Sequence, residues 1–555
     1  MEEEQILDLK GLKVALLEPN GEEQIKLTID EMLQKWTGEF GCWQMRHFVL
    51  TSLAWTLEAL HTMVMIFADR QPPWQCKDSV GSSCSPASSV CSMADAFWEW
   101  VQGPGVSTVS EWGLICGDKY KVGVVQSAFF LGCLAGAGIF GHLSDSSLGR
   151  KGCLTMVCAA NAVLGILTAM SANYWVYLSL RLLTGICTGG VGLCAFVLAT
   201  EPVGPSKRGP VGMSVFYLFS MGVAVLPAIS YWCTTWRLLY IFTSIPSALF
   251  CLCVLPFISE SPRWYLVRGR LEDAMIVMRS IAQANGNTIP QGISLKLDQE
   301  EEENQTQDST LHDPQGIFLK LDQEEENQTQ DSTLHEVSGN LLDVLSSPMT
   351  RSRIIIMVFI WFACAIVYYG LSLNVVNLSS NLYLSVFLNG IAEMPAFALT
   401  ALFLNKLGRR VMLVSTMLLS GFFASVGSVI SAVLHNPNVD TSLVGILTAG
   451  QLACGLVGIF GMAGTYNLLY IYTSELFPTV VRNAALGFTS QAGHIGALIA
   501  PLVVVMASIY PWLPLAIIGM AGMVGGILGF VLPETMNRPM YETMAGMEYG
   551  EISSA

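Results

Sequence analysis

Residues 201–208 read EPVGPSKR and residues 475–482 read ELFPTVVR, and each stretch follows a long apolar run. The glutamate and the arginine are seven residues apart in both copies, and the copies lie 274 residues apart. Glu260 in SESPRW and Glu534 in PETMNRP repeat the same offset of 274 residues. Residues that recur at a fixed offset indicate an internal repeat. The chain is therefore expected to consist of two similar halves.

The composition of the 555-residue chain is that of a membrane protein. Hydrophobic residues make up 52% of it, charged residues only 13%, and the mean hydropathy is +0.51. A soluble domain carries about 25% charged residues, and a transmembrane helix needs about 20 consecutive apolar ones. Twelve such runs occur along the chain: 46–69, 121–142, 153–171, 175–199, 211–232, 237–258, 353–373, 381–404, 411–433, 442–466, 484–508 and 511–532. We therefore expect an all-α membrane protein in which twelve transmembrane helices form two repeats of six.

Several function classes are disfavoured by the sequence. The spans contain no nucleophile–base set and no cluster of metal ligands, so we expect neither an enzyme nor a cofactor or metal site. The glycine-rich GICTGGVG at 185–192 lies within a span and lacks the Lys-Ser/Thr of a nucleotide-binding loop, so close helix packing is its expected role. The net charge of −15 argues against nucleic acid as a partner.

Lysine and arginine concentrate in the loops on one side of the spans. They follow the even-numbered spans at Arg150, Lys151, Lys207, Arg208, Arg263, Arg268, Arg270, Arg279, Lys406, Arg409, Arg410, Arg482 and Arg538. The opposite loops hold only Arg70, Lys77, Lys119, Lys121 and Arg237. Because basic loops stay in the cytoplasm, both termini and the linker between the halves are expected there.

Four of the fifteen cysteines share the polar loop 70–120, which the charge pattern places outside the cytoplasm: Cys76, Cys84, Cys91 and Cys116. Their spacing fits no zinc site, and four cysteines allow three pairings. Two disulfides in an oxidising compartment are expected, with free thiols as the alternative. The pairing stays open.

The chain divides into five regions. They are a cytoplasmic tail (1–45), a six-helix half (46–258), a cytoplasmic linker (259–352), a second six-helix half (353–532) and a cytoplasmic tail (533–555). In the linker, GISLKLDQEEEENQTQDSTLH is followed by GIFLKLDQEEENQTQDSTLH, and so acidic a segment is expected to be disordered. Its sequons at Asn304 and Asn327 are expected to stay unglycosylated. In the first tail, Thr28 and Glu31 have the spacing of a capping box and predict a short helix.

Five short motifs resemble those of the major facilitator superfamily: GHLSDSSLGRK (141–151), its counterpart ALFLNKLGRR (401–410), RLLTG (181–185), SESPRW (259–264) and YTSELFPTVVRN (472–483). The large cysteine loop and the ELFPTVVRN run are similar to the organic cation/carnitine transporters. The stretch LTIDEMLQKWTGEFGCWQMRHFVLTSLAWTLEALHTMVMIFAD (27–69) is similar to their plant members. The resemblance implies the major facilitator fold, with a substrate site at the membrane midplane between two parallel repeats.

The resemblance further implies a secondary active transporter that moves organic cations or zwitterions such as carnitine by alternating access. Its partners are the small-molecule substrate, protons as the coupling ion and the lipid bilayer. A proton-coupled porter of sugars or other small solutes is the alternative within this fold, and a non-transporting membrane sensor is the alternative from a different class. The vacuolar membrane and the plasma membrane both stay open as its location.

Charged residues at the cytoplasmic ends of the spans are the candidates for gating: Asp145, Arg150, Glu201, Arg208, Glu475 and Arg482, with Arg181 of RLLTG beside them. Such groups can pair in one conformer and separate in the other, which biases a two-state rocking motion. Static helix-end contacts are the alternative. In the second half Asn405 stands where the pattern has an acid, so the first half is expected to carry most of the charged gate.

Ionisable residues within a span cost several kcal/mol unless they face a cavity or have a partner. Glu393 matches a glutamate that the resembled family implicates in cation binding, and it is assigned to substrate or proton binding, with a partnered structural acid as the alternative. Glu58 and His61 are three residues apart on one helical face, where they form a proton relay or satisfy each other. His494 stands where cation-selective relatives carry an acid, and it is assigned to the substrate site.

Aromatic residues complete the expected site. Trp361 and Tyr368 are seven residues apart on one helical face and match aromatic binding positions of the family. Aromatic faces attract quaternary ammonium groups, and ordinary packing is the alternative. Gly189 and Gly192 replace a lysine and a tryptophan of animal relatives, which is expected to open the cavity. Three further tyrosines are weaker candidates: Tyr369, Tyr466 and Tyr470.

Overall fold

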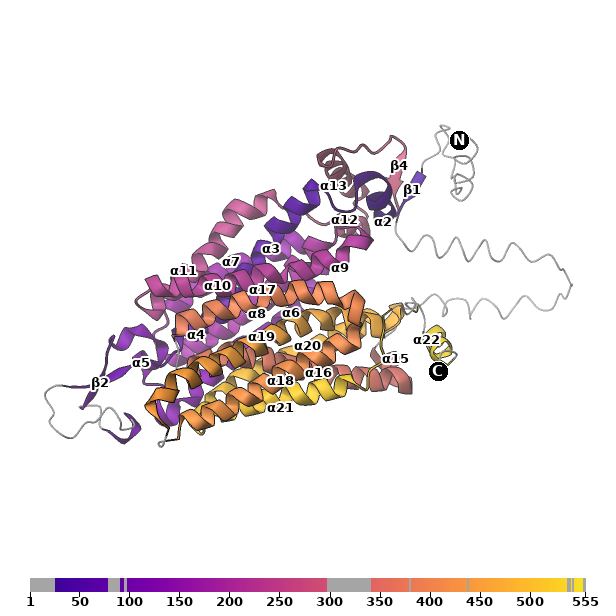
Figure 1. Ribbon diagram of the computed structural model, residues 1–555. Helices are drawn as coiled ribbons and strands as arrows, with labels where there is room; N and C mark the ends of the chain where they lie inside the picture. Colours follow the sequence, from indigo (N-terminus) through magenta and orange to yellow (C-terminus); the bar gives the residue numbers. More distant parts are fainter. Residues whose placement is uncertain are drawn as a thin grey trace, which may run out of the picture.

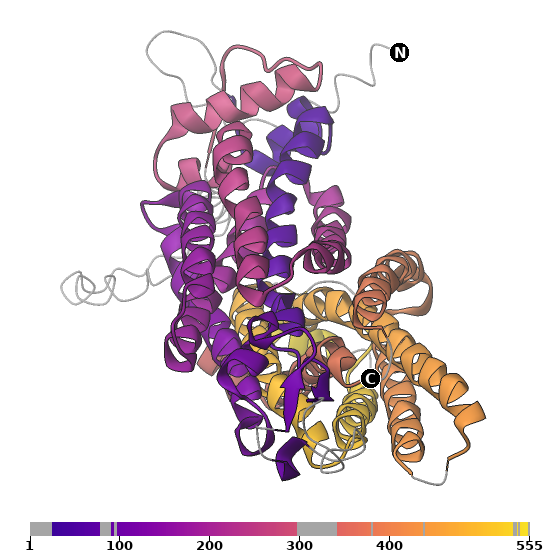
Figure 2. The ribbon, with the colours of Figure 1, turned by 90° about the vertical axis from the view of Figure 1, so that its left-hand side faces the viewer.

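The computed structural model describes residues 25–77, 90–93, 97–296, 341–378, 381–436, 439–536, 541 and 544–552. These residues form a bundle of long helices in two groups, one from each half of the chain (Figure 1). Figure 2 shows the two groups side by side from another direction. Most of the tandem copy lies outside the described residues, as do Cys84, Asn304 and Asn327.

The two groups have matching helices. The first contains α3 (Cys42–Met63) with α4 (Met65–Ala68), α6 (Tyr120–Asp145), α7 (Gly149–Ala169), α8 (Tyr174–Thr200), α9 (Pro205–Ser214) with α10 (Phe216–Trp232), and α11 (Trp236–Leu249). The second contains α16 (Pro348–Asn374), α17 (Leu382–Leu407), α18 (Arg409–Leu434), α19 (Thr441–Leu476), α20 (Thr479–Val505) and α21 (Leu513–Gly529).

The expected twelve-helix architecture is confirmed. In the described part of the chain, eleven helices are long and apolar enough to cross a membrane. The apolar helix α21 has 17 residues and falls in the twelfth expected span. The protein is a multi-pass membrane protein.

The halves meet through two equivalent helix pairs. Helix α6 packs against α20, and α10 packs against α17. Exchanging the halves exchanges these pairs, because α6 and α17 are the second helices of their halves while α10 and α20 are the fifth. The internal repeat of the sequence is therefore also a repeat of the structure.

Glycines allow α6 and α8 to approach closely. A methyl group at Gly185 would clash with the backbone carbonyl of Phe129, and one at Gly189 would clash with that of Cys133. This is the close packing that small residues permit between membrane helices. It confirms the packing role of GICTGGVG and corrects one expectation, since Gly189 fills a helix contact and does not open a cavity.

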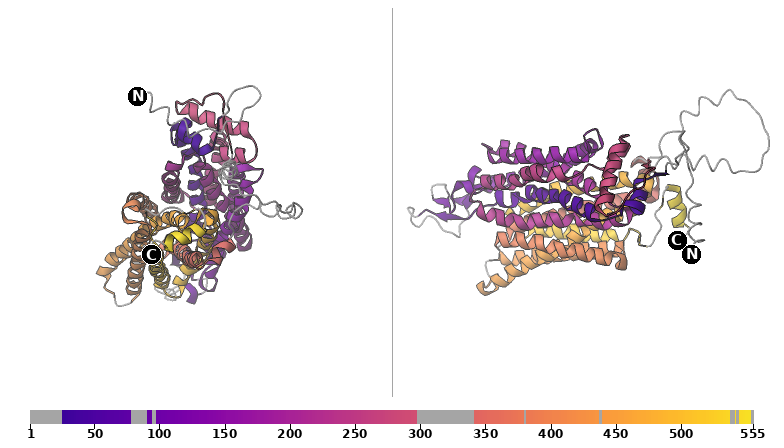
Figure 3. Two further views of the ribbon diagram at one scale, coloured as in Figure 1. Left: turned by 90° about the vertical axis from the view of Figure 1, so that its right-hand side faces the viewer. Right: turned by 90° about the horizontal axis from the view of Figure 1, so that it is seen from above.

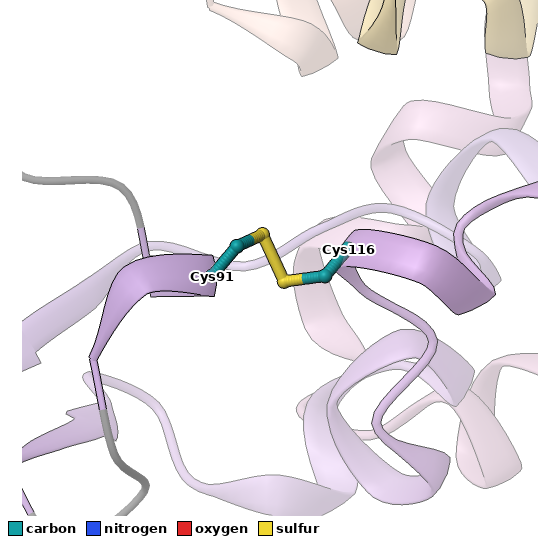
Figure 4. The surroundings of a disulfide bond; sticks show 2 residues. All are labelled: Cys91 and Cys116. Carbon is teal, nitrogen blue, oxygen red and sulfur yellow. A yellow bond between two sulfur atoms is a disulfide. The ribbon is translucent and has the colours of Figure 1, made fainter.

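One end of the bundle carries the cysteine loop, and we call it the loop end (Figure 1). There β2 (Trp74–Cys76) pairs antiparallel with β3 (Trp98–Trp100), and α5 (Thr108–Trp112) packs nearby. A disulfide joins Cys91 to Cys116 (Figure 4). Cys76 is disulfide-bonded as well. The expected oxidised loop is thus present.

The opposite end carries both ends of the described chain, and we call it the termini end (Figure 3). In the first half, β1 (Ile25–Leu27) pairs in parallel with β4 (Ile293–Leu295). The predicted capping box is present, because Thr28 and Glu31 cap α2 (Ile29–Met32). Helices α2, α12 (Pro262–Val267) and α13 (Leu271–Ala284) and these strands enclose a small apolar core.

Two short helices lie at the termini end of the second half. They are α15 (Leu341–Ser346) and α22 (Met544–Ile552). Ser347 donates a hydrogen bond of 2.5 Å to Glu548, which links the start of α16 to the C-terminal helix. Residues at both edges of the linker are therefore folded against the halves that they join.

Candidate substrate site

Glu393 lies in the middle of α17 and is completely buried. Its carboxylate accepts a hydrogen bond from Ser220 of α10, in the other half. It accepts a second from the hydroxyl of Tyr368 on α16, at 3.0 Å. A buried charge is tolerated when such donors satisfy it. Glu393 therefore bridges the two halves from the middle of α17.

Glu58 on α3 has a different environment. Its Oε2 atom is buried and has no hydrogen-bond partner. The carboxylate lies over Gly192 of α8, where a side chain would collide with it. It is close enough to three tyrosines of the other half to interact with them electrostatically: Tyr369, Tyr466 and Tyr470. A buried carboxylate oxygen without a donor is costly, so this half-buried group is available for a ligand or a proton.

His61 is not the partner of Glu58. Its Nε2 lies 3.0 Å from the hydroxyl of Ser247 on α11, and the imidazole is completely buried. The guanidinium of Arg181 donates to the backbone carbonyl of His61 at 3.2 and 3.3 Å, just before α3 ends at Met63. Arg181 thus stabilises the interruption between α3 and α4, and it also lies over the ring of Phe129 at 4.2 Å.

The aromatic residues form a buried pair and a group of three that are more accessible. Trp361 and Tyr368 are buried, and Trp361 donates to Thr473 at 3.0 Å. Three tyrosines pack against them and are only partly buried, and we call these the front tyrosines: Tyr369, Tyr466 and Tyr470. The ring centroid of Trp361 is 4.8 Å from that of Tyr470 and 5.7 Å from that of Tyr466. The three tyrosines that were the weaker candidates from the sequence are thus the more accessible ones, and the two stronger candidates pack against them.

The front tyrosines face the first half. The ring of Tyr369 lies 4.8 Å from Phe130 of α6, and that of Tyr470 lies 6.2 Å from Phe216 of α10. His494 on α20 is also partly buried, and the preceding Gly493 lies against the ring of Trp361. The structure therefore brings Glu58, the tyrosines and Glu393 together between the halves.

A charged cluster stabilises the termini end of the first half. Arg150 at the start of α7 binds Asp145 at 3.0 Å and Glu201 at 3.2 Å. Glu260 accepts the backbone N–H of Lys151 at 3.0 Å. Burial raises the pKa of the Glu201 carboxyl, and the charge of Arg150 opposes that rise.

The second half has an equivalent cluster. Arg409 at the start of α18 binds Glu475 at 2.9 Å. Glu534 accepts the backbone N–H groups of Arg409 at 2.8 Å and Arg410 at 3.0 Å. Burial alone would raise the pKa of Glu534, but its backbone N–H donors hold that pKa below its usual range. The second half thus has an arginine–glutamate pair of its own without an acid at Asn405, and the expectation that the first half carries most of the charged gate stays a prediction.

The other two arginines of the predicted gating set have separate partners. Arg208 binds Asp30 of α2 at 2.7 Å, and Asp30 also binds Arg263. Arg482 donates to the backbone carbonyl of Ser474 at 2.7 Å. The seven-residue spacing of glutamate and arginine is thus a repeat signature and does not mark an ion pair.

Comparison with known proteins agrees with this architecture. Residues 107–545 match the family described as "Sugar (and other) transporter". The chain is 54% identical to organic cation/carnitine transporter 4 of Arabidopsis thaliana over 97% of its own length and 94% of the relative. It is 30% identical to the organic cation transporter protein of Drosophila melanogaster over 93% of its own length and 94% of the relative. The chain belongs to the major facilitator superfamily of membrane transporters.

Solved structures show the same fold for this transporter. The inward-open xylose transporter XylE from E. coli superimposes with a TM-score of 0.58 at 16% identity, covering 91% of this chain and 99% of that one. The family and the fold make the protein a transporter and not an enzyme.

Sequence reasoning missed one buried acid of the transporter. Asp69 follows α4 at the loop end and is 6% exposed. It accepts hydrogen bonds from Thr108 at 2.7 Å, Tyr177 at 2.8 Å and Gln126 at 3.4 Å. Its position at the edge of a span made it look like a loop residue, and the only sequence signal was an acid directly after an apolar run.

Proposed function

We propose that the transporter carries organic cations or zwitterions, such as carnitine, by alternating access with protons as the coupling ion. The observation that supports this best is the half-buried Glu58 carboxylate, whose Oε2 atom is buried without a hydrogen-bond partner and which lies near enough to the three partly buried tyrosines to interact with them electrostatically. A carboxylate with aromatic rings nearby is a surface that attracts an ammonium group. The Arabidopsis and Drosophila relatives named as organic cation transporters support the same substrate class.

Glu58 and the front tyrosines are proposed to contact the cationic group, with His494 at the edge of the site and with Trp361 and Tyr368 fixing the tyrosines. Glu393 is proposed to couple the proton to movement. Its hydrogen bond from Ser220 crosses between the halves, so a proton on Glu393 weakens a contact that holds α10 to α17. A carboxylate accepts such bonds best when it is ionised.

The orientation follows from the charge pattern. We propose that the termini end faces the cytoplasm and the loop end faces the exterior or a lumen, since basic residues gather at the termini end. The halves contact each other at the loop end, where Ser127 donates to the carbonyl of Leu498 at 2.7 Å and Arg70 donates to Tyr383 at 3.3 Å. This conformer is then the one closed toward the exterior or the lumen.

The charged clusters of the termini end complete the mechanism. Arg150 and Arg409 each bind a glutamate of their own half in this conformer, and these contacts are proposed to separate in the other conformer and so to bias the rocking motion. They are proposed to be the gating residues, together with Asp145, Glu201 and Glu475.

The test is uptake of labelled carnitine and tetraethylammonium into proteoliposomes, with and without an inward proton gradient. Glu58→Gln is expected to raise the substrate concentration at half-maximal uptake by at least about tenfold, because it removes a charge-assisted contact. Glu393→Gln is expected to retain binding and lose stimulation by the gradient. Glu99→Gln is the matched control, since Glu99 is exposed and bonds only Gln75 among the described residues. Folded protein that moves neither solute would contradict the proposal and favour a porter of sugars or other neutral solutes.

A further inference from the structure

A cavity of about 370 Å³ lies at the loop end between the two halves. Its walls come from α4 and the start of α6 in the first half, and from residues 373–382 and 504–505 in the second. Small-molecule sites in proteins commonly have about 300–1,000 Å³. Most of the lining is apolar, with Met65 and Val122 on one side and Leu373 and Val504 on the other. The cavity is therefore large enough and apolar enough for an organic ligand.

Two basic residues border this cavity. Arg70 is half-buried and donates to the hydroxyl of Tyr383 at 3.3 Å, across the boundary between the halves. Lys119 is also half-buried, and no acid of the described chain forms an ion pair with it. The nearby Asp118 pairs with Lys121 at 2.8 Å. A half-buried ammonium group with no counter-charge favours an anion.

The one acid that borders the cavity is already engaged. Oδ1 of Asp69 accepts hydrogen bonds from Thr108 and Tyr177, and Oδ2 accepts one from Gln126. Two basic side chains and one acid, whose two oxygens already accept hydrogen bonds, border the cavity. The cavity therefore has a net positive charge. The chemistry complements a molecule with an apolar body and a single negative group.

We propose that this cavity binds an amphiphilic organic carboxylate, whose apolar part lies between the halves and whose carboxylate binds Lys119 and Arg70. Such a ligand contacts both halves at once. It therefore stabilises the conformer in which their loop ends are together, because a ligand shifts an equilibrium toward the state that it binds better. The site is separate from the one around Glu58, and the inference does not depend on the substrate proposed above.

The test uses the purified full-length transporter in detergent, with 4-phenylbutyrate as the probe and thermal unfolding as the measurement. A saturable rise in Tm is expected with 4-phenylbutyrate. Its uncharged analogue 4-phenylbutyramide is expected to give none at the same concentration. Lys119→Gln is expected to weaken the apparent affinity by about tenfold or more, since it removes a hydrogen bond to a charged group. Lys121→Gln is the matched control and is expected to bind like the wild type.

A second variant keeps the test decisive if Lys119→Gln does not fold. Val122→Trp fills the cavity without changing any charge, and it is expected to abolish the rise in Tm. Equal stabilisation by the amide, unchanged affinity in Lys119→Gln, or full binding in Val122→Trp would each overturn the proposal.

Discussion

Gly192 leaves the space that the Glu58 carboxylate occupies. A methyl group on Gly192 would clash with Oε2 of Glu58 and would lie 3.0 Å from both Cδ and Oε1. Helices α3 and α8 pack against each other, so the backbones have little freedom to separate. Non-bonded heavy atoms prefer about 3.5–4.0 Å. Gly192→Ala is therefore expected to displace the carboxylate by roughly 1 Å or more.

The effect on binding can be worked out from this displacement. At an effective dielectric constant of about 20, two unit charges attract by about 4 kcal/mol at 4 Å and by about 3 kcal/mol at about 5.5 Å. A loss of about 1 kcal/mol corresponds to about a fivefold change in affinity. Alanine favours a helix over glycine by about 1 kcal/mol, so the variant is not expected to fold less well.

The assay is the concentration dependence of tetraethylammonium uptake into proteoliposomes. Gly192→Ala is expected to raise KM about fivefold. Gly138→Ala on α6 is the matched control and is expected to leave KM unchanged, because its added methyl group would meet no atom within 4 Å. In a Glu58→Ala background, Gly192→Ala is expected to have no further effect, since no carboxylate remains to be displaced. An unchanged KM in Gly192→Ala, or an equal effect in the Glu58→Ala background, would refute the reasoning.

Three further predictions follow from the helix ends and the loop. Arg409→Gln and Arg150→Gln are each expected to slow uptake by about tenfold, because each removes an arginine–glutamate contact. A normal rate in either variant would contradict the paired gate. Glu534 has a lowered pKa in the folded protein, so it stabilises the fold above its ordinary pKa of 4.5, and that contribution is lost as the pH falls through the lower folded value. Glu534→Gln should accordingly lower Tm at pH 7 and lose the difference in strong acid, which thermal unfolding at a series of pH values measures. Cys91→Ser is expected to destabilise the loop by about 3 kcal/mol on the chain-entropy estimate, and a Tm equal to that of the wild type would show that the disulfide contributes nothing.

The candidate site was only partly predictable from the sequence. The cost of an ionisable group in a span singled out Glu58, His61, Arg181 and Glu393 correctly as residues that need an explanation. It could not assign their partners. His61 bonds Ser247, 186 residues away, and Glu393 bonds Ser220, 173 residues away. A spacing of three within one helix said nothing about which of these long-range partners each side chain would find.

The helix-end charges show the same limit. The glutamates and arginines of EPVGPSKR and ELFPTVVR revealed the repeat, and they belonged to the predicted gating set. In the structure Arg150 and Arg409, from the preceding loops, take the two glutamates, while Arg208 binds Asp30 of the first tail. Sequence neighbours at a helix end point in different directions, and only the packing of several helices decides which charges meet.

The amino-acid sequence by itself determined the membrane character, the number of spans and the division into two halves. These properties depend on contiguous segments, because the transfer of about 20 apolar residues into lipid and the internal hydrogen bonds of a helix are local effects. The tertiary structure alone decided that the Oε2 atom of Glu58 has no hydrogen-bond partner, that Gly189 is a packing residue whereas Gly192 makes room for an acid, and that a positively charged cavity lies at the loop end. Those properties depend on atoms brought together from different helices, and their distances are set by how the two halves pack.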